Sequence, residues 1–319
     1  MQSAVRYGIL SAASIVPRFV KGMRLSENGE VTAIWSRSEE KARTMAEELG
    51  IERVYTDHRE LLNDPDIDAV YIPLINSLHY PYVKEALLAG KHVLCEKPFV
   101  LHAEEARELS ALSHEKGLFL TEAVKTPFLP IYDRIREILN SGMLGSMRYM
   151  EFRQSYTVGP YVGGWNTEID KGGGVLYGNE AYFFTMAEYL AGEILSVTGT
   201  LSFPDGEAED QLAVSALLPN GVLATLQVSR RVLFENGLTI RCDHGKIVIP
   251  DYWKASRAYV YEGDRLKETI DIPCPFEFQY ELKHYNQCIQ NGLVESPVTT
   301  HEDTIRRIAF TEQLYAPYR

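Results

Sequence analysis

The chain has 319 residues, of which 45% are hydrophobic and 24% are charged, values that are ordinary for a globular protein. Its formal net charge of −12 argues against non-specific binding to nucleic acid, because a phosphate backbone attracts a basic surface. The sequence contains neither an N-terminal signal segment nor an apolar run of about 18 residues that could span a membrane, so we expect a cytoplasmic protein.

Residues 5–124 alternate short β-rich runs with amphipathic helices. Strands are predicted at 5–10, 30–35, 68–74, 91–96 and 118–123, and helices at 14–25, 38–50, 79–90 and 102–117. This alternation predicts a doubly wound parallel sheet that binds its ligand at the carboxyl ends of the strands.

From about residue 146 the pattern changes to strands joined by tight turns. Strands are predicted at 146–156, 194–203, 211–218, 222–229, 238–242 and 246–250, with hairpin turns at 219–221, 243–245 and 263–264. Helices are expected near 175–191, 277–291 and 301–315. The second half is therefore expected to be an α+β domain with a large, mostly antiparallel sheet.

The first strand leads into the turn Ser11-Ala12-Ala13-Ser14-Ile15-Val16, where a dinucleotide fingerprint would have glycines. Serine and alanine are small enough to let a pyrophosphate approach, and the amides of the following helix N-terminus favour an anion. A βα turn without any cofactor would explain this stretch equally well.

Arg37 follows the second predicted strand, between Ser36 and Ser38. An acidic residue at this position would bind the ribose 2′-hydroxyl of NAD, whereas an arginine can hold the 2′-phosphate of NADP. The alternative is a solvated arginine at a helix start.

The stretch "HVLCEKPFV", residues 92–100, places Glu96, Lys97 and Pro98 directly after a strand. A lysine at the carboxyl edge of the sheet can donate a proton or a hydrogen bond to a carbonyl or alkoxide. By itself, such a lysine is more commonly a solvated surface group.

The block "DAVYIPLINSLHYPYVKEALLAGKHVLCEKP", residues 68–98, favours a functional lysine over a solvated one. It resembles the glucose–fructose oxidoreductase and inositol dehydrogenase (Gfo/Idh/MocA) family. The segments "SGMLGSMRY", "KGGGVLYG", "NGVLATL" and "ESPVT" extend the resemblance over nearly the whole chain. Within the family, the sequence is most similar to the branch of dimeric dihydrodiol dehydrogenases and NADP-dependent xylose dehydrogenases.

The resemblance implies a Rossmann domain at residues 1–124 and an α+β substrate domain at residues 125–319, whose open sheet would join copies into a homodimer or larger oligomer. It implies hydride transfer between NADP, or NAD, and a hydroxyl or carbonyl group of a sugar, polyol or trans-diol. The alternative is a regulatory protein of the same fold that senses a dinucleotide or sugar without turning it over. No metal is expected, and the four cysteines are spaced as reduced thiols rather than as zinc ligands.

The resemblance and the motifs together assign the site residues. Cofactor binding is assigned to Ser11, Ala13, Ser14, Ile15, Ser36, Arg37, Asn76, His79, Glu96 and Lys97. Catalysis is assigned to Lys97, next to an expected cis peptide bond at Pro98, and to Tyr182.

The predicted helix 175–191 departs from the family pattern. Gly178 stands where the family carries an aspartate, and Tyr182 stands where it carries histidine or tyrosine. Glu180 lies on another face of the helix and is not expected to replace the acid. Tyr182 could equally be a core residue.

Lys125 and Tyr182 are assigned to substrate binding, and at position 125 relatives tend to have an aromatic side chain. A cationic pocket wall would favour a different, anionic substrate, and the alternative is a solvated lysine at the domain junction. The loop 157–171 is expected to carry substrate specificity.

Overall fold

The computed structural model describes residues 3–156, 164–204 and 207–318. The chain divides into two compact units. The first comprises residues 1–124 and 276–308, and the second comprises residues 125–275 and 309–319. The sequence assigned residues 276–308 to the C-terminal domain, whereas in the structure they pack with the first unit.

The first unit contains a six-stranded sheet in the order β3-β2-β1-β4-β5-β6, with every pair parallel. Its strands are β1 (Val5–Leu10), β2 (Gly29–Trp35), β3 (Arg53–Tyr55), β4 (Ala69–Ile72), β5 (His92–Glu96) and β6 (Leu120–Ala123). The strand order reverses between β1 and β4, where a doubly wound sheet opens a crevice for its ligand. The predicted doubly wound parallel sheet is confirmed.

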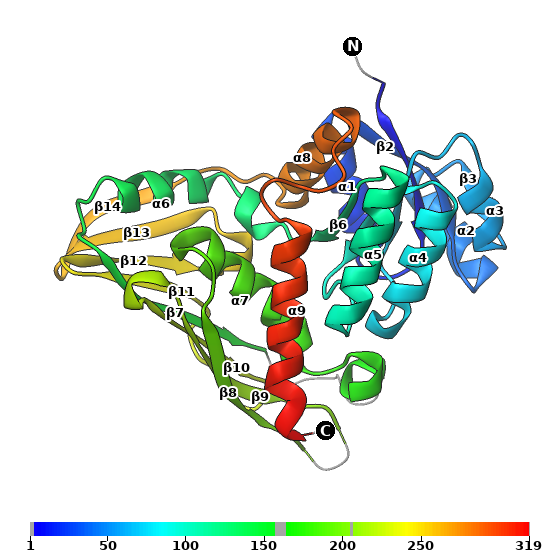
Figure 1. The fold of residues 1–319 in the computed structure, drawn as a ribbon. Coiled ribbons are helices and arrows are strands. Elements are labelled where there is room, and N and C mark those ends of the chain that lie inside the picture. Colours follow the sequence, from blue (N-terminus) through cyan, green and yellow to red (C-terminus); the bar gives the residue numbers. More distant parts are fainter. Residues whose placement is uncertain (1–2, 157–163, 205–206, 319) are drawn as a thin grey trace. The chain divides into compact units, whose positions relative to one another are not determined.

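Helices cover this sheet (Figure 1). They are α1 (Val16–Ser26), α2 (Glu39–Leu49), α3 (His58–Asn63), α4 (His79–Leu88), α5 (Ala103–Lys116) and α8 (Phe278–Gln290). Helix α4 packs against α5, and α1 packs against α8. Because α8 joins a buried network in which the Tyr7 hydroxyl donates to Asn286 Oδ1 at 2.9 Å, the C-terminal segment forms part of this unit.

The central strands of this sheet are buried on both faces. Every residue of β4 and β6 is buried, as expected where helices cover both sides of a parallel sheet. Phe19 of α1 stacks on Tyr71 of β4, with ring centroids 3.8 Å apart. Helix α2 is capped at both ends, since Ser38 accepts the Lys41 N–H at 3.4 Å and Gly50 ends the helix in a left-handed conformation.

The second unit contains an eight-stranded sheet in the order β14-β13-β12-β11-β7-β10-β9-β8. Its strands are β7 (Met147–Ser155), β8 (Ser196–Ser202), β9 (Gln211–Leu217), β10 (Leu223–Ser229), β11 (Gly237–Cys242), β12 (Gly245–Pro250), β13 (Arg257–Glu262) and β14 (Arg265–Asp271). The β7–β10 pair is parallel and the other pairs are antiparallel, so the mostly antiparallel prediction is confirmed.

Two helices belong wholly to the second unit, α6 (Ile131–Asn140) and α7 (Val175–Ala191), and α7 has the bounds that the sequence predicted. Helix α7 packs against β7, β9 and β10. The last helix, α9 (His301–Tyr315), begins in the first unit and ends in the second.

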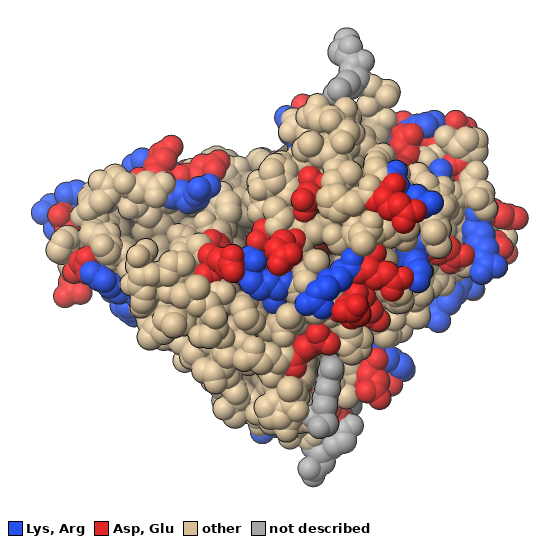
Figure 2. All heavy atoms as spheres, viewed as in Figure 1, with Lys and Arg blue, Asp and Glu red and all other residues tan. Residues whose placement is uncertain are grey.

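Charged side chains of both signs are interleaved on the face of the protein drawn in Figure 2, in keeping with a net charge that is acidic overall. No helix within the described ranges is long and apolar enough to cross a membrane.

Candidate active site

Lys97 immediately follows β5, so it lies at the carboxyl edge of the parallel sheet. The Lys97–Pro98 peptide bond is cis, as the resemblance implied. Glu96, the last residue of the strand, accepts a hydrogen bond from the Tyr71 hydroxyl at 2.5 Å and another from the Lys97 N–H at 3.2 Å. Burial and the nearby Glu96 carboxylate raise the pKa of Tyr71, so the phenol remains a donor.

A buried ion pair holds the backbone just beyond Lys97. Glu122, in β6, accepts the Phe99 N–H through Oε1 at 2.9 Å and pairs through Oε2 with the Arg307 guanidinium of α9 at 2.7 Å. The two charged side chains are only 3% and 2% exposed. A buried carboxylate is stable only when it is paired, and Arg307 provides that partner for Glu122. Because Glu122 also holds the Phe99 N–H, both residues are positioning residues for the Lys97 loop.

His79, at the start of α4, contacts the same loop from another side. Its Nδ1 lies 2.8 Å from the Pro98 carbonyl and its Nε2 lies 3.0 Å from the Leu74 carbonyl. Burial lowers the pKa of His79, and the neutral ring donates to one of these carbonyls. Asn76, one turn earlier, is 7% exposed. The structure thus brings His79 to the Lys97 loop, while cofactor contact by Asn76 and His79 stays a prediction.

The turn between β1 and α1 does not need glycine for its backbone conformation. Among the described non-glycine residues, positive φ occurs at Glu27, Asn220 and Asp251, so neither Ser11 nor Ala13 adopts the conformation that favours glycine. The first turn of α1 carries no acidic residue, and Ser14 is exposed beside Ile15, the residue before the helix. An anion would therefore meet helix amides without an opposing carboxylate.

Arg37 is exposed just beyond the end of β2. Ser38 caps α2 with its hydroxyl, and Ser36 Oγ accepts the Ser38 N–H at 3.4 Å, so both serines are partly engaged in local structure. Binding of the NADP 2′-phosphate by Arg37 and of the pyrophosphate by the α1 N-terminus stays a prediction.

In the second unit, Lys125 and Tyr182 form a contact that the sequence did not predict. The Lys125 ammonium lies 5.5 Å from the centroid of the Tyr182 ring, within cation–π range. Lys125 is 6% exposed, which differs from the solvated lysine considered from the sequence. Tyr182 is half-buried rather than fully enclosed.

The position of the missing family acid is sterically open. A Cβ atom added at Gly178 would meet no atom of the described residues within 4 Å. Glu180 is buried, with 2% exposure, in keeping with its expected place on another face of α7.

Glu209 anchors the N-terminus of α7 and was not found from the sequence. Its Oε1 accepts the Leu176 N–H at 2.7 Å and the Tyr315 hydroxyl at 2.8 Å. Burial raises its pKa to about 7. The carboxyl lies beside Gly174, where any Cβ would collide with it, so the glycine-rich entry to α7 makes space for this anchor.

Lys97 lies in the first unit and Tyr182 in the second, and their joint action stays a prediction. Of the predicted substrate loop, residues 157–163 lie outside the described residues, and residues 164–171 contain two short helices, Trp165–Thr167 and Ile169–Lys171.

Two family models match the chain. Residues 5–124 match an oxidoreductase family with an NAD-binding Rossmann fold, and residues 132–248 match the GFO/IDH/MocA C-terminal domain. Trans-1,2-dihydrobenzene-1,2-diol dehydrogenase of Bos taurus is 31% identical over 92% of this chain and 91% of its own length. An uncharacterised oxidoreductase of Rhizobium meliloti is 35% identical over 90% of each chain.

Solved structures share the fold. The 3-ketoreductase KijD10 of Actinomadura kijaniata, solved with NADP and TDP-benzene, has a TM-score of 0.87 at 24% identity and covers 98% of each chain. Aldose-aldose oxidoreductase of Caulobacter crescentus, solved with glycerol, has a TM-score of 0.86 at 25% identity and covers 98% of this chain and 97% of its own.

Proposed function

The chain belongs to the GFO/IDH/MocA oxidoreductase family, and from this premise we propose which of its residues perform the chemistry and which substrate they accept. It is an NAD(P)-dependent oxidoreductase that acts on a CH–OH group or the corresponding carbonyl. Its curated relatives are named as diol dehydrogenases, and they give no support to the alternative of a non-catalytic sensor.

The observation that carries the site assignment is the way the Lys97 loop is held. Tyr71 fixes Glu96 before Lys97, and Glu122 fixes the Phe99 N–H after it. Two strands of one unit, β4 and β6, thus hold a single short loop at the carboxyl edge of the sheet, where a doubly wound fold binds its ligand. A loop held by buried polar contacts in this way favours a functional role for Lys97 over that of a solvated surface lysine.

NADP, when bound, supplies or accepts the hydride. Lys97 donates a hydrogen bond to the reacting oxygen and transfers its proton as the carbonyl becomes a hydroxyl, or holds the alkoxide in the reverse direction. The amides at the α1 N-terminus, with Ser11, Ala13, Ser14 and Ile15 forming the turn, receive the pyrophosphate. Arg37 pairs with the 2′-phosphate.

Tyr182 is proposed to orient the substrate from α7. Lys125, beside the Tyr182 ring, adds positive charge to the same wall of the second unit. Because the family acid is replaced by Gly178, the charged group beside the Tyr182 ring is the Lys125 ammonium rather than a carboxylate of this helix. We therefore favour a sugar, polyol or trans-diol that carries a carboxylate or phosphate group.

The assignment is tested by following reduced-nicotinamide absorbance with a panel of neutral and acidic sugars and diols. We expect turnover with NADP and a lower KM for NADP than for NAD. Arg37→Ala should raise the KM for NADP about 10- to 150-fold, since loss of one charge-assisted phosphate contact costs roughly 1.5–3 kcal/mol, and it should leave the KM for NAD unchanged.

Arg43→Ala is the matched control, because this exposed arginine already pairs with Glu39 within α2. An equal KM effect on both cofactors would contradict the role of Arg37. Tight binding of NADPH without hydride transfer to any member of the panel would favour the sensor instead.

We also propose that the protein acts in the cytoplasm. Copies of the chain are proposed to associate through the open face of the eight-stranded sheet. Along β7, Met150 and Phe152 are buried, whereas Tyr149, Glu151 and Arg153 face the other way and are half-exposed. A hollow of about 400 Å³ on this sheet is lined by Arg153, Thr239 and Val248 among others. Light scattering should give a mass of at least twice 36.1 kDa, and a monomer mass at micromolar concentration would contradict this interface.

A further inference from the structure

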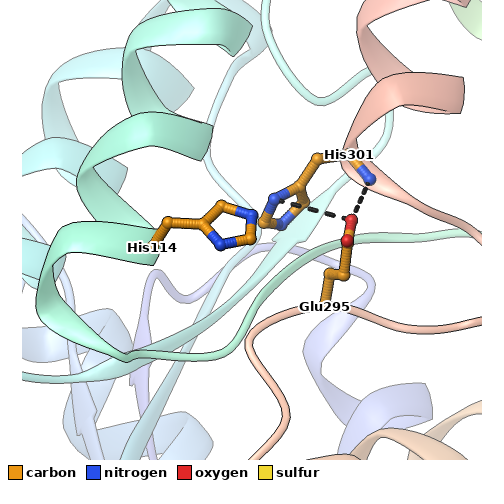
Figure 3. Close-up of side chains that lie close together, drawn as sticks. All are labelled: His114, Glu295 and His301. Carbon is orange, nitrogen blue, oxygen red and sulfur yellow. Dashed lines mark hydrogen bonds and ion pairs between the residues drawn. The ribbon is translucent and has the colours of Figure 1, made fainter.

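Three potential metal ligands meet in the first unit. His114 lies in the last turn of α5, Glu295 in the connection after α8, and His301 at the first position of α9. One ligand atom from each side chain lies within 4.8 Å of the other two. Figure 3 shows the His114 side chain reaching from α5 toward the His301 ring and the Glu295 carboxylate approaching the same ring.

His301 is oriented in the way that metal-binding histidines usually are. Its Nε2–H donates to the Leu120 carbonyl at 2.8 Å, which fixes the tautomer and leaves the lone pair on Nδ1. That Nδ1 lies 3.7 Å from Glu295 Oε2 and 3.0 Å from the Ser110 hydroxyl, a group that can rotate. Burial lowers the pKa of His301.

The other two groups are placed to complete the set. The Glu295 Oε2 accepts the His301 backbone N–H at 2.6 Å, which ties the carboxylate to the start of α9. The His114 and His301 rings meet edge to face, with centroids 5.4 Å apart and planes at 88°.

We propose that His114, Glu295 and His301 form a binding site for one transition-metal dication of the Zn²⁺ class, with water as the remaining ligand. Two imidazoles and one carboxylate suit Zn²⁺ or Co²⁺, whereas Mg²⁺ and Ca²⁺ prefer an all-oxygen set. This departs from the absence of metal expected from the cysteine pattern, since residues 114, 295 and 301 are too far apart in sequence to form a spacing motif.

The site requires a small contraction on binding. Bonds of about 2.0–2.1 Å to a tetrahedral Zn²⁺ place the ligand atoms roughly 3.3 Å from one another. The exposed His114 and the half-exposed Glu295 can move inward by about 1.5 Å, while the buried His301 stays fixed by Leu120. The bound ion would then cross-link the end of α5 to the start of α9, the helix that carries Arg307.

The test uses the full chain, stripped with a chelator and titrated with Zn²⁺ by calorimetry and with Co²⁺ by visible absorption. We expect one equivalent of Co²⁺ to give the intense bands of a tetrahedral site, and Zn²⁺ to abolish them and to raise the Tm. His114→Ala should lower Zn²⁺ affinity at least tenfold, and Glu295→Gln should do the same by removing the charged ligand.

His102→Ala is the matched control, since this exposed histidine stands at the opposite end of the same helix. It should bind Zn²⁺ as the unaltered chain does. His114 is exposed, so His114→Ala should fold normally and its loss of binding would be interpretable. The proposal is overturned if the chain takes up no stoichiometric metal, or if His114→Ala and His102→Ala bind Zn²⁺ equally well.

Discussion

Lys97→Met is expected to lower kcat by about 10²–10⁴-fold, the range that a positioned general acid or base contributes. Methionine keeps much of the length of the lysine side chain but has no proton to give to the substrate oxygen. The KM for NADP should change little, because the proposed phosphate contacts lie at the α1 turn and at Arg37. Steady-state assays at saturating NADPH, with the best substrate from the panel, measure both values.

Lys116→Met provides the control, because Lys116 is an exposed lysine at the end of α5 in the same unit. Its kcat should equal that of the unaltered enzyme. If Lys97→Met also retains full turnover, Lys97 is not the acid–base residue and the buried contacts around its loop serve stability alone. If kcat falls and the pH dependence of kcat is lost with it, the proton-transfer role is supported.

Elements with a strong period could be predicted from the sequence. The helix at 175–191 and the final helix at 301–315 match the structure residue for residue, because each is long and is bounded by clear apolar recurrence. Strand β3 and helix α3 were missed, since three and six residues are too few to establish a period. Helix α6 was missed as well, although its Ile131, Ile135 and Ile138 recur at helical spacing.

Backbone geometry shows whether the turn after β1 needs the glycines that its sequence lacks. Ser11 and Ala13 have ordinary φ angles, so the turn does not need glycine for its conformation. Sequence alone shows only that the glycines are absent, because the φ angle of a turn residue depends on how strand and helix pack.

The partners of the candidate site were beyond sequence reasoning. Lys97 could be found because it directly follows a strand in a recognisable motif. Glu122 and Arg307 are 185 residues apart, so no local motif joins them. One signal was available, the glutamate inside the apolar run "LFLTEA", since a charge in a buried strand requires a partner. Nothing in the sequence identified that partner as Arg307, because pairing across a fold is set by topology rather than by spacing.

Arg307→Met is expected to lower the free energy of unfolding by about 3–5 kcal/mol, the loss typical of breaking a buried ion pair. The substitution leaves the Glu122 carboxylate buried without its guanidinium, and the side chains of this pair are only 3% and 2% exposed. Urea or thermal unfolding followed by circular dichroism measures the change. Arg107→Met is the control, because the exposed Arg107–Glu104 pair on α5 should contribute no more than about 1 kcal/mol.

The double variant Glu122→Gln with Arg307→Met separates stability from positioning. Glutamine removes the stranded charge, and its amide oxygen can still accept the Phe99 N–H that Glu122 Oε1 accepts at 2.9 Å. We therefore expect the double variant to recover much of the lost stability and, because the Lys97 loop regains its anchor, most of kcat as well. Recovery of stability without kcat would mean that Arg307 acts on the reaction by another route, and a stable Arg307→Met single variant would show that the pair contributes nothing to the fold.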